Sequence, residues 1–217
     1  MKPWCPVKRF FTADPHFGHI LRYEAQNRCD AYGRPLASID HRDTYLVDQW
    51  NAAVATGDLV YCLGDFSYKL HAMHAILPYL NGAKVLIVGN HDPFFKNRAS
   101  RNEVARANAI NHALHAGFSA VFMQWEIDLP GVGAVRLCHF PYAPPASVDT
   151  PAYDLRYLAY RPLPGPEKAL LHGHVHSQWK TRIDPGQPLM LNVGVDVWGM
   201  RPVSEAEIIA TLKEGLC

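Results

Sequence analysis

Five short blocks of aspartate, asparagine and histidine stand out in this chain of 217 residues, which contains 12 histidines. In chain order they are Asp14-x-His16, Gly64-Asp65, Gly89-Asn90-His91-Asp92, His139 and Gly173-His174-x-His176. Histidine is the commonest metal ligand in proteins and titrates nearest to neutral pH, and carboxylates bind the same divalent ions. The side chains of these blocks are therefore suited to binding metal ions and to acting as catalytic acids or bases.

Each block follows a short apolar run that is typical of a buried β-strand. The runs are residues 8–13, 59–63, 84–88, 134–138 and 169–171. Ligand sites of open α/β sheets lie just outside the carboxyl ends of the strands, so we expect the five blocks to converge on one place. Taken alone, a block such as Gly64-Asp65 is better explained as a capped turn than as a metal site.

The ordered set of five blocks resembles the signature of the calcineurin-like metallophosphoesterase family. The resemblance covers about residues 10–195, and every signature position is present. The contexts of residues 14–19 and 63–66 are most similar to the compact bacterial and phage members of that family. The resemblance implies a four-layer α/β/β/α fold and a hydrolase that cleaves phosphate esters with a binuclear metal centre.

The resemblance also implies two ligand sets that share one carboxylate. One ion would take Asp14, His16, Asp65 and His176, and the other Asp65, Asn90, His139 and His174. Asp65 would bridge, because each carboxylate oxygen has its own lone pairs whereas an imidazole ligates one ion. Mixed nitrogen and oxygen donors without thiolate suit two divalent ions of Mn, Fe, Zn, Co or Ni. In this scheme the ions activate a shared water, which attacks phosphorus in line.

His91 resembles the catalytic histidine of the family, which implies that it protonates the departing alkoxide. Asp92 would accept a hydrogen bond from the other ring nitrogen of His91 and fix its tautomer. A plainer interpretation makes His91 a turn residue that Asp92 caps. His19, Arg22 and Tyr142 are further candidates for contacting the substrate, and Arg22 is equally well explained as a surface charge.

Strand-like and helix-like segments alternate in the first half of the chain, and the second half is mostly strands. This order predicts an α/β protein in which two mixed sheets pack as a sandwich with helices on the outer faces. Helices are expected at residues 40–55, 70–80 and 101–115, and from Ser204, which forms a capping box with Glu207. Residues 120–128 and 134–138 are expected to pair as a hairpin, and residues 1–217 are expected to form a single metallophosphoesterase domain with an insertion at about 141–166.

Residues 141–166 differ in composition from the rest, with seven prolines and four tyrosines. A connection of this length is uncommon in a compact domain unless it is functional or disordered. Because it begins two residues after His139, its near end is expected at the rim of the metal cleft. We predict that this insertion forms one wall of the substrate pocket, and the alternative is a surface crossover.

The overall composition, with 48% apolar and 19% charged residues, is that of a globular protein. A net charge of +1 disfavours a nucleic-acid partner held by bulk charge. No run approaches the roughly 18 apolar residues of a membrane span, and the opening residues lack the apolar region of a signal peptide. Five cysteines without a CxxC pair suit a reducing compartment, so we expect a cytoplasmic protein with no membrane partner and leave its oligomeric state open.

Together these features predict an enzyme, a metallophosphoesterase acting on a small phosphate ester. A phosphodiester of the nucleotide type is favoured, because no obvious clamp of several arginines surrounds the blocks to hold a dianionic monoester. The alternatives are a phosphomonoesterase or protein phosphatase, a non-catalytic scaffold that keeps the metal fold, and a nuclease. The complete set of signature residues disfavours the scaffold, and the near-neutral charge disfavours the nuclease.

Overall fold

The computed structural model describes residues 6–19, 28–36, 38–95, 103–145 and 154–216 of the chain. The strands within these ranges are β1 (Arg9–Thr12), β2 (Leu59–Cys62), β3 (Ala83–Ile87), β4 (Phe118–Phe122), β5 (Gln124–Leu129), β6 (Gly133–Cys138), β7 (Ala169–His172), β8 (Thr181–Arg182), β9 (Leu189–Asn192) and β10 (Val203–Ser204). The helices are α2 (Ile39–Ala53), α3 (Leu70–Ile76), α4 (Glu103–Ala116) and α5 (Glu205–Leu216), with short 3-10 helices η1 (Leu77–Tyr79), η2 (Asp154–Tyr160) and η3 (Val195–Val197).

The first sheet has the strand order β10-β1-β2-β3-β4. Strands β1 to β4 are parallel neighbours, and β10 is an antiparallel edge strand beside β1. Parallel strands are covered on both faces, which explains why β1 and β2 are buried almost throughout and not only at alternate positions. The parallel order places the ends of β1, β2 and β3 at one edge of the sheet.

The second sheet has the order β5-β6-β7-β9-β8. Its central strands β6, β7 and β9 are parallel, and β5 and β8 pair antiparallel at the two edges. The expected hairpin is confirmed, since β5 and β6 pair from Gln124 with Cys138 to Leu129 with Gly133. Left-handed glycines at 131 and 133 turn the chain between them, a conformation that glycine adopts without steric cost.

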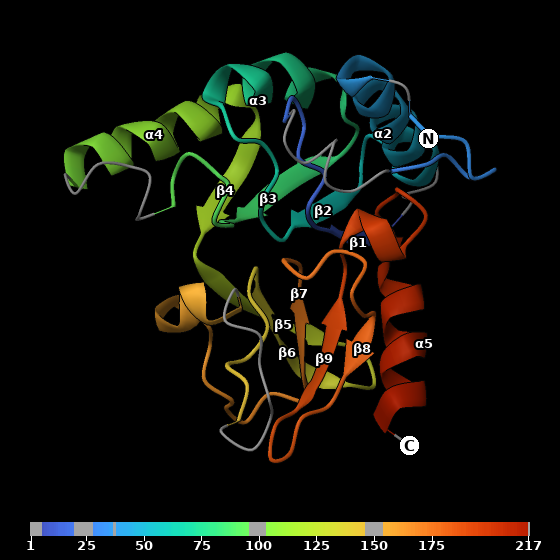
Figure 1. Ribbon diagram of the computed structural model, residues 1–217, viewed down its shortest axis with the longest axis vertical. Coiled ribbons are helices and arrows are strands. Elements are labelled where there is room, and N and C mark those ends of the chain that lie inside the picture. The colour runs from blue at the N-terminus through green and yellow to red at the C-terminus, as the bar shows by residue number, and fades with distance from the viewer. Residues whose placement is uncertain (1–5, 20–27, 37, 96–102, 146–153, 217) are drawn as a thin grey trace.

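Alternate side chains of both sheets meet in one buried cluster. Phe11, Tyr61 and Ile87 of the first sheet belong to the same cluster as Leu137 and Leu171 of the second. The opposite face of the first sheet packs against α2, α3 and α4, which lie above it in Figure 1. The prediction of an α/β protein with two mixed sheets is thus confirmed.

Helix α5 lies at the side of the molecule in Figure 1, and its buried residues Ile208 and Leu212 join the cluster between the sheets. On the other face of the second sheet, Leu170 and Met190 share a cluster with Phe140. That face thus packs against residues that follow β6, and the four-layer arrangement with helices on both outer faces stays a prediction.

Most of the expected helices agree with the structure. The expected helices at 40–55 and 101–115 correspond to α2 and α4, and the capping box of α5 forms with Ser204 N donating to Glu207 Oε2 at 2.9 Å. The helix expected at 70–80 is shorter, because Pro78 lacks an N–H and the chain continues as the 3-10 helix η1. Among the described residues, no helix has the length and apolar character needed to cross a membrane.

Candidate metal centre

The loops that leave the two sheets meet at the expected edge. His16 N donates to the carbonyl oxygen of Asp65 at 3.1 Å, which joins the loops after β1 and β2. His174 N donates to Asp14 Oδ2 at 2.9 Å, which joins the loop after β7 to the loop after β1. Hydrogen bonds within and between the sheets therefore gather the blocks that the sequence spreads over 160 positions.

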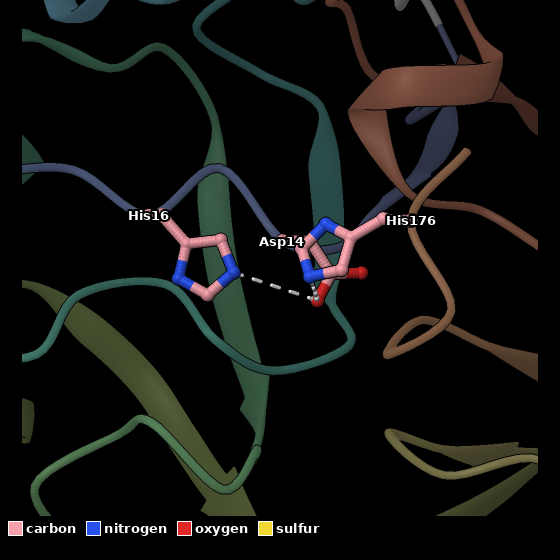
Figure 2. Close-up of side chains that lie close together, drawn as sticks. All are labelled: Asp14, His16 and His176. Carbon is pink, nitrogen blue, oxygen red and sulfur yellow. Dashed lines mark ion pairs between the residues drawn. The ribbon is translucent and has the colours of Figure 1, made fainter. Parts of the chain in front are cut away.

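One carboxylate oxygen of Asp14 faces two imidazole rings (Figure 2). The Nε2 atoms of His16 and His176 each lie 3.9 Å from Asp14 Oδ1. This separation is too long for a hydrogen bond, but it suits two atoms that each lie about 2.0–2.2 Å from one shared cation. Asp14 Oδ1 is buried and accepts no hydrogen bond from the described residues. The three side chains therefore fit a metal ion better than they fit one another.

Asp65 lies between this group and a second one. Its Oδ2 atom is 3.7 Å from His16 Nε2 and 3.5 Å from His139 Nε2. The groups whose donor atoms lie within 4.8 Å of one another are Asp14 with His16 and His176, and Asp14 with Asp65 and His139. A carboxylate with an imidazole on each side is suited to bridging two cations, the role that the resemblance implies for Asp65.

The tautomer of His139 also favours a cation. The carbonyl oxygen of Leu63 lies 2.8 Å from His139 Nδ1 and accepts its proton, so Nε2 keeps its lone pair. Nε2 then faces Asn90 Oδ1 across 3.1 Å, with a lone pair on each atom. Two facing lone pairs repel each other unless a positive charge lies near both. His174 completes this side, with its ring centroid 5.2 Å from that of His139, and burial lowers its pKa well below the ordinary value.

Left-handed backbone conformations concentrate at the predicted ligands. They occur at Asp14 (φ 57°), His16 (φ 54°), Asp65 (φ 52°), His174 (φ 73°) and His176 (φ 51°). Within the described part of the chain, Met200 is the one other non-glycine residue with a positive φ. Such a conformation costs an L-residue roughly 1–2 kcal/mol and persists where the surroundings enforce it, typically at functional sites. The backbone strain is thus concentrated at residues whose side chains must point at a common centre.

Gly64 and Gly173 lie where the neighbouring atoms leave no room for a side chain. A Cβ atom on Gly64 would lie 2.5 Å from His139 Nδ1, and a Cβ atom on Gly173 would lie 2.5 Å from Asp14 Oδ2. Real Cβ atoms essentially never approach other atoms below 3.0 Å. Larger side chains at either position would push the ligand residues apart.

Asp92 has a different set of partners from the one expected. Its Oδ1 atom accepts from the backbone N–H groups of Phe66 and Ser67, and its Oδ2 atom accepts from those of Asp65 and Gly89. These four bonds fill the acceptor positions of a carboxylate, so Asp92 fastens the loop after β2 to the loop after β3. Burial and the charge of Asp65 raise the pKa of Asp92 to about 7. The expectation that Asp92 orients the ring of His91 is therefore replaced by a structural role.

His91 lies beside the candidate ligands. Its backbone N–H donates to Asp65 Oδ1 at 2.7 Å, and its ring centroid is 5.3 Å from that of His16. His19 is buried, lies 5.4 Å from His91 between ring centroids, and stacks on Tyr68 at 5.1 Å. The predicted catalytic residue His91 and the substrate candidate His19 thus lie on the same side of the centre. Arg22 falls outside the described residues.

Tyr142 is not placed to contact a substrate. It is 1% exposed, and its hydroxyl donates to Glu167 Oε1 at 2.5 Å. The same carboxylate accepts from Arg136 Nη2 at 2.9 Å, so Tyr142 anchors the start of the insertion at 141–166 to the second sheet. The insertion reaches the centre through another residue, since the ring of Tyr157 in η2 lies 5.6 Å from that of His174. Residues 146–153 of the insertion lie outside the described ranges.

Sequence reasoning missed the charged side chains that support the ligand loops. Arg42 of α2 is fully buried and donates to the carbonyl oxygens of His16 and His19 at 2.9 and 3.2 Å. Arg28 and Asp196 form a second buried pair beside His176. The only available signal was that Arg42 falls on the apolar face of a predicted helix, next to positions such as Leu46.

Comparisons with known proteins identify a shared fold and no established activity. No known family model matches the chain. An uncharacterized protein, MJ1445 of Methanocaldococcus jannaschii, is 35% identical over 92 residues, which are 40% of this chain and 48% of that protein. The chain thus matches only about half the length of this curated relative.

Two solved structures are similar over most of the chain. AQ665 of Aquifex aeolicus, a protein of unknown function, has a TM-score of 0.57 at 21% identity, and the likeness covers 95% of this chain and 100% of that one. The phosphopantetheinyl hydrolase PptH of Mycobacterium tuberculosis has a TM-score of 0.44 at 12% identity, over 91% and 95% of the two chains. This chain therefore shares the fold of AQ665. In this chain that fold is mixed α/β with two five-stranded sheets, and candidate metal-binding residues lie where the loops of the sheets meet.

Proposed function

We propose that this protein is a binuclear metal-dependent phosphoesterase of the calcineurin-like type. The observation that carries the proposal is the backbone strain at the predicted ligands: five of them share a left-handed conformation, and Asp14 presents a buried oxygen to two imidazoles. Cations among the donor atoms would account for the buried Asp14 Oδ1, which accepts no hydrogen bond from the described residues.

Two divalent ions of Mn, Fe, Zn, Co or Ni suit the donor set. One would be held by Asp14, His16, Asp65 and His176, and the other by Asp65, Asn90, His139 and His174. Bound there, such a pair of ions supplies a nucleophile from water at neutral pH and neutralises charge on the phosphoryl oxygens. The protein itself fixes the donors, through the strained backbone and through Asp92, which fastens two of the loops together.

His91 is the proposed general acid. Its backbone N–H is held by Asp65 Oδ1, which keeps the residue next to the carboxylate proposed to bridge the ions. From there the imidazole donates its proton to the oxygen of the departing alcohol, and the next water restores it. The neighbouring rings of His19 and Tyr68 limit the directions in which His91 can turn.

A phosphodiester is the proposed substrate class. The buried arginines close to the ligand loops, Arg28, Arg42 and Arg161, already donate to carboxylates or backbone carbonyls. A dianionic monoester needs more cationic donors than a singly charged diester. Because these arginines already donate to groups of the protein, the diester is favoured. Tyr157, beside His174, offers a ring face to a nucleotide-sized leaving group.

The proposal is tested with protein loaded with Mn, Ni or Zn and offered bis(p-nitrophenyl) phosphate, p-nitrophenyl phosphate, and cyclic and linear nucleotides. Hydrolysis of the diester at a higher kcat/KM than the monoester is expected. Asp65→Asn should remain folded yet lose most bound metal and most activity, because one neutral amide replaces the carboxylate between His16 and His139. His74→Ala, a change at an exposed histidine of α3, is the control and should keep both. Two tightly held ions in Asp65→Asn, measured by elemental analysis, would overturn the bridging assignment.

A further inference from the structure

We propose that Arg28 and Asp196 are a positioning pair that fixes the metal-binding tautomer of His176 and locks it against the loop of Asp14 and His16. The inference rests on the proposed metal-dependent function and names the residues that set the affinity of one of its two ion sites. Neither Arg28 nor Asp196 belongs to the five blocks that the sequence singles out.

Asp196 is shared between Arg28 and His176. Arg28 Nε donates to Asp196 Oδ1 at 2.8 Å, and Arg28 Nη2 donates to Oδ2 at 3.1 Å. His176 Nδ1 lies 3.0 Å from the same Oδ2 atom. The side chains of Arg28 and Asp196 are 1% and 8% exposed, so water competes little for these bonds. A two-pronged contact between a guanidinium and a carboxylate fixes both planes, which aims Oδ2 at the imidazole.

The orientation of Asp196 decides which ring nitrogen of His176 carries the proton. Because an ionised carboxylate accepts hydrogen bonds and cannot donate them, the proton of the neutral ring must lie on Nδ1. Nε2 then keeps its lone pair, and it is this atom that faces Asp14 Oδ1 across 3.9 Å. A carboxylate behind a histidine also raises the basicity of the ligating nitrogen.

Arg28 also holds the loop that carries Asp14 and His16. Its Nη2 atom donates to the carbonyl oxygen of Asp14 at 2.5 Å, and its Nη1 atom donates to that of Pro15 at 2.7 Å. One guanidinium therefore joins the left-handed loop that carries Asp14 and His16 to the loop after β7 that carries His176. All three ligands of the first group depend on it, whereas His139 of the second group is held separately by the carbonyl oxygen of Leu63.

Asparagine at position 196 cannot perform this task. Its NH₂ group must take the place of Oδ2, which faces both His176 and Arg28 Nη2, or of Oδ1, which faces Arg28 Nε. In the place of Oδ2, the NH₂ group donates to His176 Nδ1 and moves the ring proton to Nε2, the atom needed for the metal. In the place of Oδ1, the NH₂ group opposes the donor Arg28 Nε, and the two-pronged contact that orients residue 196 is lost. Either geometry weakens the first ion site and leaves the second intact.

The test compares wild type with Asp196→Asn and Arg28→Lys, and the matched control is Asp184→Asn. Asp184 also accepts from an arginine, Arg182 Nε at 2.8 Å, and within the described ranges it is not hydrogen-bonded to a candidate ligand. The first readout is the tautomer of His176 in metal-free protein at pH 8, from ¹H–¹⁵N NMR with His176→Gln to assign the signals. The second is a Mn titration that resolves the affinities of the two ion sites.

Wild type and Asp184→Asn are expected to show the proton of His176 on Nδ1 and to bind two ions. Asp196→Asn should shift the ring toward the other tautomer and weaken one ion site by about 10- to 100-fold, with the other site unchanged. Arg28→Lys should fall between them, since lysine keeps the charge but not the two-pronged contact. An unchanged tautomer together with unchanged affinities in Asp196→Asn overturns the positioning role, and so does equal weakening of both sites. Failure of wild type to bind two ions would instead overturn the proposed function.

Discussion

Asp92→Asn separates two roles for a residue that the sequence places next to the proposed general acid. If Asp92 orients His91, the substitution lowers the rate and spares the stability of the fold. If Asp92 fastens the loops after β2 and β3, as its bonds to Asp65 N, Phe66 N, Ser67 N and Gly89 N indicate, the stability falls first.

The expected loss of stability follows from the number of acceptor atoms on the side chain at position 92. The single oxygen of asparagine can keep the two bonds at one end of the side chain, and its NH₂ group then opposes the two N–H donors at the other. Each buried donor left without an acceptor costs about 1–3 kcal/mol. Removing a buried negative charge next to Asp65 offsets part of this cost, so the free energy of unfolding should fall by about 2–4 kcal/mol.

Urea unfolding of metal-free protein at pH 8, above the pKa of about 7 that burial and Asp65 impose on Asp92, measures this loss. Asp48→Asn, at an exposed position of α2, is the control and should change the free energy of unfolding by less than about 0.5 kcal/mol. Turnover of bis(p-nitrophenyl) phosphate is then measured at saturating metal, under conditions where the variant is folded, and should fall less than tenfold. A drop of 100-fold or more at unchanged stability would refute the structural role and restore Asp92 as the partner of His91.

Three further predictions concern single side chains. His91→Ala should lose roughly 10²–10⁴-fold in rate on diesters with poor leaving groups and less on p-nitrophenyl esters, and an equal loss on both would argue against acid catalysis. Tyr142→Phe should lower the free energy of unfolding by about 1–3 kcal/mol, because buried Glu167 loses a donor, with KM within a few fold; a large rise in KM at full stability would contradict the anchoring role. Hydrogen bonding from Arg201 lowers the pKa of Glu207 to about 2, so this pair stabilises the fold above about pH 4.5 and loses its effect as the pH falls toward 2. Glu207→Gln should therefore destabilise by about 1 kcal/mol or less at pH 7 and by less at pH 3 in urea unfolding, and an equal effect at both pH values would count against the ion pair.

Much of the fold was predictable because its signals are local. The hairpin of β5 and β6 follows from two apolar runs around glycines, and the capping box of α5 from a serine and a glutamate three residues apart. The convergence of the blocks followed from strand order, since parallel strands present their carboxyl ends at the same edge. Asp14, His16 and His176 meet there although 162 positions separate Asp14 from His176.

The partners of buried polar side chains were not predictable in this way. Asp92 stands next to His91 in sequence but bonds to backbone groups of another loop, and Tyr142 stands near His139 but turns to Glu167. The choice of partner depends on which donors and acceptors the packed loops bring within about 3 Å, and sequence neighbours are only some of them.

Sequence alone therefore determined the strands, the order of the ligand blocks and the kinds of atoms they offer, because backbone periodicity and side-chain chemistry are properties of short segments. Tertiary structure decided how those atoms are aimed. Arg28 and Asp196, 168 positions apart, become partners only when the segments after β1 and β9 meet, and their burial away from water gives the contact its directing effect on His176.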